Sequence, residues 1–187
     1  MNQALPLAQY FLICRELNQP AVYPGNYNGY HQVEMQCYAP SIADLHVWAL
    51  TQEHTKNEAF NHGNGDPMAW RFLWKLFGEY FGVSLNGCEP GPETEKPVFS
   101  LAEWSCDKKS VWEGIIAKNG SGSVESFQEQ GFGMMDGLLS RPMPGSQFIA
   151  SIAKARRLGW TREDDSYGAW VETFRAYENA GVLPMSV

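Results

Sequence analysis

One stretch of the chain, residues 66–82, holds so many large apolar side chains that it limits the folds open to the rest. Asp66 followed by Pro67 indicates a capped helix start, and Gly82 indicates the helix end. The apolar residues between them lie on more than one face of such a helix: Trp70, Phe72, Leu73, Trp74, Leu76, Phe77, Tyr80 and Phe81. We therefore expect a helix that is buried on both sides, one of them against a second subunit if the chain dimerises.

Helical spacing of apolar residues also dominates the rest of the chain, and alternating patterns are few. Longer helices are expected at residues 5–17, 40–54, 100–118 and from Asp164 or Asp165 to Gly181; shorter ones at 124–130 and 146–158, around an irregular stretch 131–145; strands within 21–38 and 58–65. With 187 residues, 44% of them hydrophobic, the chain can form one core. The sequence predicts a single α+β domain over residues 1–187, predominantly helical with a few short strands.

The composition argues against several classes of protein. The net charge of -7 is dispersed, and no Lys/Arg patch suggests a nucleic-acid partner. No apolar run approaches the ~18–20 residues that a membrane span needs, and no secretory signal is present. The cysteines form no C-x-x-C pair and the histidines have no partners at metal-ligand spacing, so we expect free thiols in the cytoplasm and no metal site.

Three stretches of motifs carry a family resemblance. The first contains I-C-R-E-L-N-Q-P, the second K-N-E-A-F-N-H-G-N-G-D, and the third K-A-R-R-L-G-W-T-R-E-D-D with W-V-E-T-F-R-A-Y-E-N-A-G-V-L-P. Together they resemble the C-terminal, substrate-binding half of the progesterone 5β-reductase and iridoid synthase-like enzymes. These enzymes are extended short-chain dehydrogenases of the NAD-dependent epimerase/dehydratase superfamily, and the resemblance is greatest to fungal members.

The resemblance implies that the nucleotide-binding half of this family is missing from the sequence. Relatives begin with a Rossmann half that carries a Gly-rich phosphate loop and a catalytic Tyr with a Lys. No G-x-G-x-x-G occurs here, because Gly63 and Gly65 are followed by Met68, and Gly131 and Gly133 by Asp136. No tyrosine has a lysine four residues later. We therefore expect a truncated dehydrogenase-like fold without a complete Rossmann domain, and no cofactor.

Two local departures from the family pattern suggest a reshaped substrate pocket. Residues 35–40 (M-Q-C-Y-A-P) replace an acidic D-x-x-D-A-R stretch, and residues 133–136 (G-M-M-D) replace G-F-F-D. The resemblance implies that the segment around Met1 and the segment 134–139 line the pocket. The predicted substrate-binding residues are Met1, Tyr30, Met134, Met135, Leu138 and Leu139.

Four polar residues near these segments are candidates for acid/base chemistry: His31, Glu34, Tyr38 and Asp136. Asp136 has apolar sequence neighbours that would raise its pKa, which suits a general acid. Simpler readings stay open. Asp136 could cap a helix that starts at Gly137, His31 could be a solvated loop residue, and Glu34 could point outward from an edge strand.

Three functions remain compatible with the sequence. The chain could be a cofactor-independent isomerase or cyclase that folds a hydrophobic small molecule of specialised metabolism, since such chemistry needs shape and one or two acid/base groups. It could instead be a non-catalytic binding or partner module, or a truncated NADPH-dependent enone reductase. In relatives, apolar surfaces of this half face the Rossmann sheet, and here they would be exposed to water. We therefore also expect a homodimer that buries that surface.

Overall fold

The computed structural model describes residues 2–141 and 149–185, and most of them are helical. The elements in chain order are α1 (Ala4–Glu16), α2 (Tyr27–His31), β1 (Val33–Met35), α3 (Ala39–Thr51), the 3-10 helix η1 (Glu53–Thr55), β2 (Pro67–Ala69), α4 (Trp70–Phe81), α5 (Leu101–Ser105), α6 (Lys109–Asn119), the 3-10 helix η2 (Val124–Ser126), α7 (Glu129–Leu139), α8 (Ala153–Arg157) and α9 (Ser166–Asn179). The strands pair antiparallel, with Val33 opposite Ala69. The predicted fold class, helical with short strands and without a complete Rossmann domain, is confirmed for the described residues.

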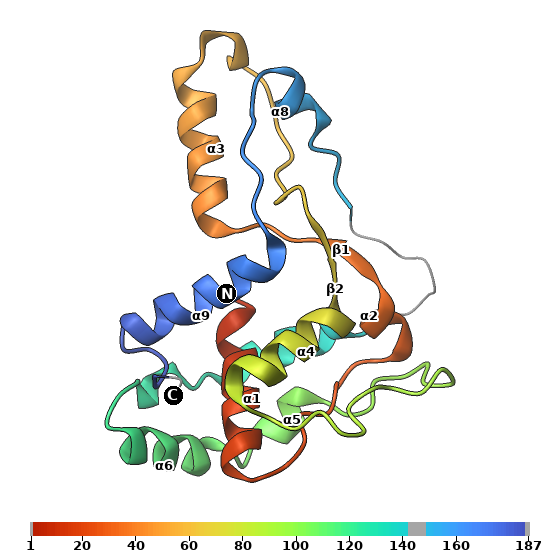
Figure 1. Cartoon of the computed structure of the whole chain (residues 1–187), viewed down its shortest axis with the longest axis vertical. Coiled ribbons are helices and arrows are strands. Elements are labelled where there is room, and N and C mark those ends of the chain that lie inside the picture. Colours follow the sequence, from red (N-terminus) through yellow and green to blue (C-terminus); the bar gives the residue numbers. More distant parts are fainter. Residues whose placement is uncertain (1, 142–148, 186–187) are drawn as a thin grey trace.

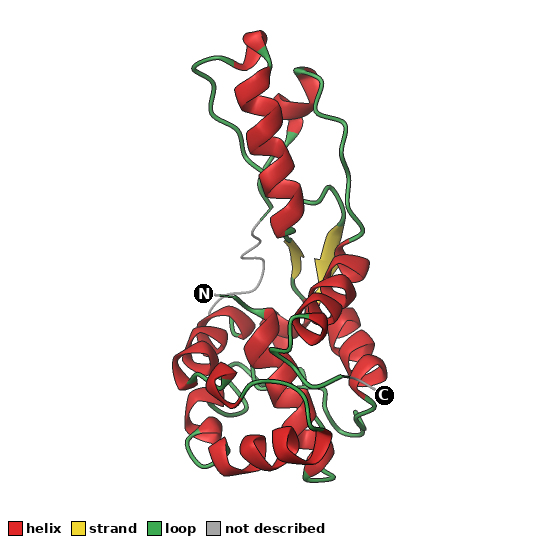
Figure 2. Cartoon of the chain, turned by 90° about the vertical axis from the view of Figure 1, so that its left-hand side faces the viewer, coloured by secondary structure: helices red, strands yellow, loops and turns green. Residues whose placement is uncertain are grey.

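Two regions of different shape make up the molecule (Figures 1 and 2). The helical lobe gathers α1, α4, α5, α6, α7 and α9 into a packed body. The arm, residues 38–65 and 149–165, contains α3 and α8 and projects from the lobe along the longest dimension of the molecule. The two-stranded sheet lies where arm and lobe meet.

Helix α1 is the centre of the helical lobe. Every residue from Pro6 to Cys14 is buried, and all of them except Gln9 are apolar. Aromatic rings from α4 surround it, and the ring of Phe11 meets that of Trp74 edge-on at 4.9 Å between centroids. The predicted helix over residues 5–17 is confirmed to within one residue at each end.

Helix α4 differs from its prediction at the start and on one face. It begins at Trp70, because Pro67 opens strand β2, a position where a missing N–H is tolerated. The Asp66 carboxylate accepts a hydrogen bond from the backbone N–H of Ser166 at 2.9 Å, so it caps α9 instead of its own helix. Phe72 is 48% exposed, and the expectation that both sides of α4 are buried was wrong at that residue.

Strand β1 buries its polar face. Val33 is 38% exposed, whereas Glu34 is buried, so the apolar alternation in the sequence does not mark the inner side of the strand. The alternative that Glu34 points outward was therefore wrong. The physical reason is a partner far along the chain, Arg141, which neutralises the buried carboxylate. Residues 58–65, a predicted strand, form no regular element.

Helix α7 occupies much of the stretch 131–145 that was predicted to be irregular. Its three glycines disfavour a helix, but Phe132, Met135 and Leu139 are fully buried on one side of it. Tertiary burial of that side outweighs the weak local preference.

Candidate functional site

A buried ion pair joins the two halves of the sequence next to the sheet. Glu34 Oε1 lies 2.6 Å from Nη2 of Arg141, and both side chains are only 8% exposed. Asn26 fixes the arginine backbone on both sides: its Nδ2 donates to the Arg141 carbonyl at 2.6 Å, and its Oδ1 accepts from the Arg141 N–H at 3.0 Å. A buried charge is tolerated when it is paired in this way. Glu34 is thus engaged in a structural pair.

The sequence reasoning missed Arg141. Its signal was nonetheless present, because Arg141 stands alone among apolar residues and prolines, and Glu34 stands in an alternating strand. Glu34 and Arg141 are thus opposite charges, each with no other charged residue within four positions, and a buried ion pair needs one of each sign.

Asp136 caps a helix from a distance. Its Oδ1 accepts from the Leu101 N–H at 2.6 Å, and its Oδ2 accepts from the Ser100 hydroxyl at 2.7 Å and from the Ala102 N–H at 3.2 Å. These groups form the start of α5, so the predicted cap of a helix starting at Gly137 was wrong, since Gly137 lies inside α7. These three hydrogen bonds occupy both oxygens of the carboxylate, so Asp136 is engaged as a helix cap.

His31 and Tyr38 have one polar side-chain contact each. His31 Nδ1 lies 3.3 Å from Nη1 of Arg71, and burial, together with that guanidinium, lowers the pKa of the imidazole. The Tyr38 hydroxyl donates to Oε2 of Glu172 at 2.8 Å, and partial burial and that carboxylate raise the pKa of the phenol. Within the described ranges, none of the four acid/base candidates hydrogen bonds to another of them.

The predicted substrate-binding residues are mostly core residues. Tyr30, Met135 and Leu139 are buried, and the Tyr30 hydroxyl lies 3.3 Å from Glu89 Oε1. Met134 and Leu138 are half-buried and pack at the edge of the core. Met1 lies outside the described residues. None of these five described residues lines either of the two hollows at the ends of α1.

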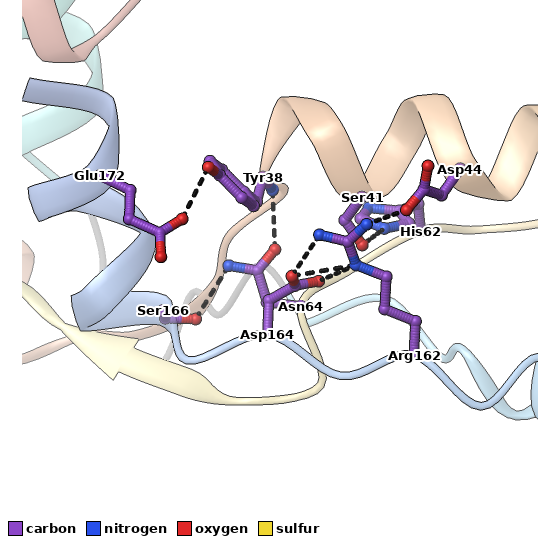
Figure 3. A network of polar contacts seen from close by, with 9 residues as sticks. All are labelled: Tyr38, Ser41, Asp44, His62, Asn64, Arg162, Asp164, Ser166 and Glu172. Atoms are coloured by element: carbon purple, nitrogen blue, oxygen red, sulfur yellow. Dashed lines mark hydrogen bonds and ion pairs between the residues drawn. The ribbon is translucent and has the colours of Figure 1, made fainter. Parts of the chain in front are cut away.

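A polar cluster links the arm to the lobe (Figure 3). At its centre Asn64, 1% exposed, accepts a hydrogen bond from the Tyr38 N–H at 2.7 Å and donates to the Ser166 hydroxyl at 3.2 Å. Arg162 pairs with Asp44 and, at 2.8 Å, with Asp164. Most partners within the cluster are satisfied by one another, which indicates a structural joint.

A second part of the same cluster pairs a serine with a histidine. Ser41 Oγ lies 2.9 Å from His62 Nε2, but Ser41 is 1% exposed and so cannot act as a nucleophile on a substrate. Burial raises the pKa of Asp164, and hydrogen bonds from Arg162 and Ser41 outweigh it and hold the pKa below its usual value.

Two hollows lie at opposite ends of α1. The larger, about 440 Å³, lies at the C-terminal end and is lined mostly by polar loop residues and by Cys14. The smaller, about 250 Å³, lies at the N-terminal end and is lined by Asn2, Leu5, Pro6, Gln9, Ser126, Gln128 and Gly131. We call the smaller one the N-terminal hollow. It combines two apolar side chains, Leu5 and Pro6, with the buried side chain of Gln9.

Other kinds of site are not seen in the described part of the chain. Residues 2–141 and 149–185 contain no group of three or more His, Cys, Asp or Glu side chains placed to hold a metal ion. None of their helices is both long and apolar enough to cross a bilayer.

Comparison with known proteins finds full-length matches to this chain. It is 36% identical to the short chain dehydrogenase gsfE of Penicillium aethiopicum over 98% of the chain and 50% of that protein. It is 32% identical to (S)-8-oxocitronellyl enol synthase of Catharanthus roseus, over 98% of the chain and 45% of that protein. It is 27% identical to 3-oxo-Delta(4,5)-steroid 5-beta-reductase of Arabidopsis thaliana, over 95% of the chain and 44% of that protein.

The chain belongs to the progesterone 5β-reductase and iridoid synthase-like short-chain dehydrogenases. No family model matches it. It spans about half the length of the curated relatives it matches. This share is the one expected from a sequence that resembles one of the two halves of the progesterone 5β-reductase-like enzymes.

The family implies a nicotinamide dinucleotide, and the described residues do not form the phosphate-binding turn of such a site. A dinucleotide fold needs a Gly-rich turn between a parallel strand and a helix, so that backbone N–H groups can approach the pyrophosphate. In the described residues the two strands are antiparallel, and β2 runs directly into α4 through Ala69 and Trp70. A buried tryptophan stands at that strand–helix junction. We derive no step through the nucleotide.

Proposed function

We propose that this chain provides the substrate-binding part of an enzyme of specialised metabolism, and that it isomerises or cyclises a hydrophobic small molecule without a nicotinamide site of its own. The observation that carries the proposal is the N-terminal hollow, with Leu5 and Pro6 as apolar wall and Gln9 as polar base. The likeness to (S)-8-oxocitronellyl enol synthases supports the substrate class and the kind of reaction.

Such a reaction can be accelerated largely by the shape of the site. Holding a flexible apolar molecule in a reactive conformation removes much of the entropic barrier to ring closure. The acid/base residue stays a prediction. Glu34 and Asp136 already serve an ion pair and a helix cap, so Tyr38 and His31 are the first two of the four to substitute.

A thermal-shift titration tests the proposal, because a ligand that binds the folded state raises the melting temperature. Terpenoid and polycyclic metabolites form one arm of the experiment, and NADPH forms the other. Stabilisation by an apolar metabolite alone supports the proposal. Stabilisation by NADPH would show that the chain has a nucleotide site and would favour a reductase. If neither kind of ligand stabilises the chain, a partner module is favoured.

A matched pair of glycine variants locates the binding. A Cβ on Gly131 would lie 3.5 Å from Pro6, an ordinary contact, so Gly131→Leu places a side chain against the wall of the hollow. Gly133→Leu adds the same side chain to the same helix α7 at an exposed position. We expect Gly131→Leu to lose the metabolite-induced shift and Gly133→Leu to keep it.

The predicted homodimer stays a prediction, which light scattering of the purified chain checks.

A further inference from the structure

Gln9 is a polar residue in an unusual place. It is 1% exposed and lies in α1 between buried apolar neighbours. Burying an amide costs free energy unless both its N–H and its C=O groups find partners. Within the described residues the amide makes one such contact: Gln9 Nε2 donates to Ser126 Oγ at 3.1 Å.

The neighbouring serine fixes which way the amide points. The Ser126 hydroxyl donates its single proton to the Ser123 carbonyl, 2.7 Å away. Its oxygen can therefore only accept from Gln9, so the nitrogen of the amide must face Ser126 and the oxygen must face away. No described residue donates a hydrogen bond to Gln9 Oε1. Gln9 and Ser126 are both lining residues of the N-terminal hollow.

We propose that the N-terminal hollow binds a small, mostly apolar molecule that carries a hydroxyl group, an alcohol or an enol, which donates to Gln9 Oε1. Ser126 acts as a positioning residue that holds the amide in the accepting orientation. This inference rests on the proposed function and narrows its substrate class. The volume of about 250 Å³ suits a molecule of about eight non-hydrogen atoms, given ~30 Å³ for one water in the liquid.

The probes for the test are cyclohexylmethanol and its methyl ether, which share a skeleton but differ in the hydroxyl donor. Their dissociation constants are measured by ligand-observed NMR with the whole chain. The wild type should bind the alcohol about tenfold more tightly than the ether, since one hydrogen bond to a buried acceptor distinguishes them. In Gln9→Met, which preserves side-chain size, the ratio should fall to about one.

Two further variants control this result. Ser126→Ala releases the amide and should reduce the preference for the alcohol while Gln9 is still present, which a purely structural role would not do. Gln130→Met removes an exposed amide from α7 outside the hollow and should behave as wild type. If Gln9→Met fails to fold, as judged by its melting temperature, Ser126→Ala carries the test.

The outcomes separate this inference from the proposed function. If the wild type binds the alcohol and the ether equally and Gly131→Leu abolishes both, the hydrogen bond to Gln9 Oε1 is overturned. The N-terminal hollow is then still supported as the binding site. Binding of neither probe overturns the hydroxyl class, and the metabolite titration then decides the proposed function independently. A preference for the alcohol that survives in Gln9→Met overturns the role of Gln9.

Discussion

The helical lobe and the arm are stabilised by different forces. In the lobe, rings of α1, α4 and α9 pack against one another, and Trp74 and Phe77 are fully buried among them. In the arm, α3 buries only Ser41 and Leu45. Hydrogen bonds and ion pairs around Asn64 hold the arm instead (Figure 3). The lobe should therefore depend on apolar area and packing, and the arm on the geometry and charge of a few polar groups.

The largest effect should come from the lobe core. Trp74→Ala removes a ring that contacts Tyr10, Phe11 and Tyr23, and it also removes a 2.8 Å hydrogen bond to the Ala21 carbonyl. We expect a loss of about 3–5 kcal/mol in the free energy of unfolding, measured by urea denaturation. Phe72→Ala on the same helix, at a 48% exposed position, should cost at most about 0.5 kcal/mol. Similar losses in both variants would contradict a lobe stabilised by its core.

The next largest effect should come from the buried ion pair. Glu34→Gln leaves the Arg141 guanidinium without its carboxylate in a site where both side chains are 8% exposed, and we expect a loss of about 3 kcal/mol. Glu16→Gln removes the exposed pair with Lys118 and should cost less than about 1 kcal/mol. The double variant Glu34→Leu with Arg141→Met should regain much of the loss, because both buried charges are removed together. Equal denaturation midpoints for the two single variants would show that burial does not matter here.

A smaller effect should follow at the joint. Asn64→Ala leaves the Tyr38 N–H without its acceptor and removes the hydrogen bond that Ser166 Oγ accepts, although the Ser166 hydroxyl still donates to the Asp66 carbonyl. We expect a loss of about 2 kcal/mol. The loss should also appear as faster amide hydrogen exchange in the arm than in the lobe. Asn61→Ala removes an exposed amide from the same segment and should leave exchange nearly unchanged. Exchange that rises uniformly over both regions would argue against a separately stabilised arm.

The smallest effect should be a pH dependence of the arm. Burial lowers the pKa of His62; Asp164 opposes this, and Arg162 and His46 add to it. Because the folded pKa lies below the unfolded value of about 6.5, the unfolded chain binds the proton more readily. Stability is then unaffected above about pH 7 and falls as the pH drops below about 6.5, until the folded pKa is passed.

His62→Gln should make the denaturation midpoint vary less with pH between 8 and 5 than it does in wild type. His31, whose pKa is also lowered by burial, provides the matched control outside the arm. If His62→Gln leaves the pH dependence unchanged while His31→Gln removes it, the titrating group belongs to the lobe.

The sequence predicted the helices that bury a continuous apolar surface. Helix α1 appears where residues 5–17 predicted it, because the apolar residues recur there at helical spacing. Helix α7 was missed since three glycines conceal the spacing of Phe132, Met135 and Leu139. The family resemblance, which the matches confirm, indicated segments of the chain that would form a pocket. It did not predict the residues that line the N-terminal hollow. Gln9 and Ser126 were not predicted, because a glutamine in an apolar helix has no local signature.

By itself, the sequence determined the fold class, the family and the lack of a Gly-rich nucleotide loop, since each depends on residues close together in the chain. Only the tertiary structure decided the partners of single polar groups. Asp66 and Asp136 both carry the local signal of a helix cap, yet they cap α9 and α5 from a distance. Glu34 is buried because Arg141 meets it from 107 residues away. A carboxylate needs donors, and folding decides which donors lie within reach.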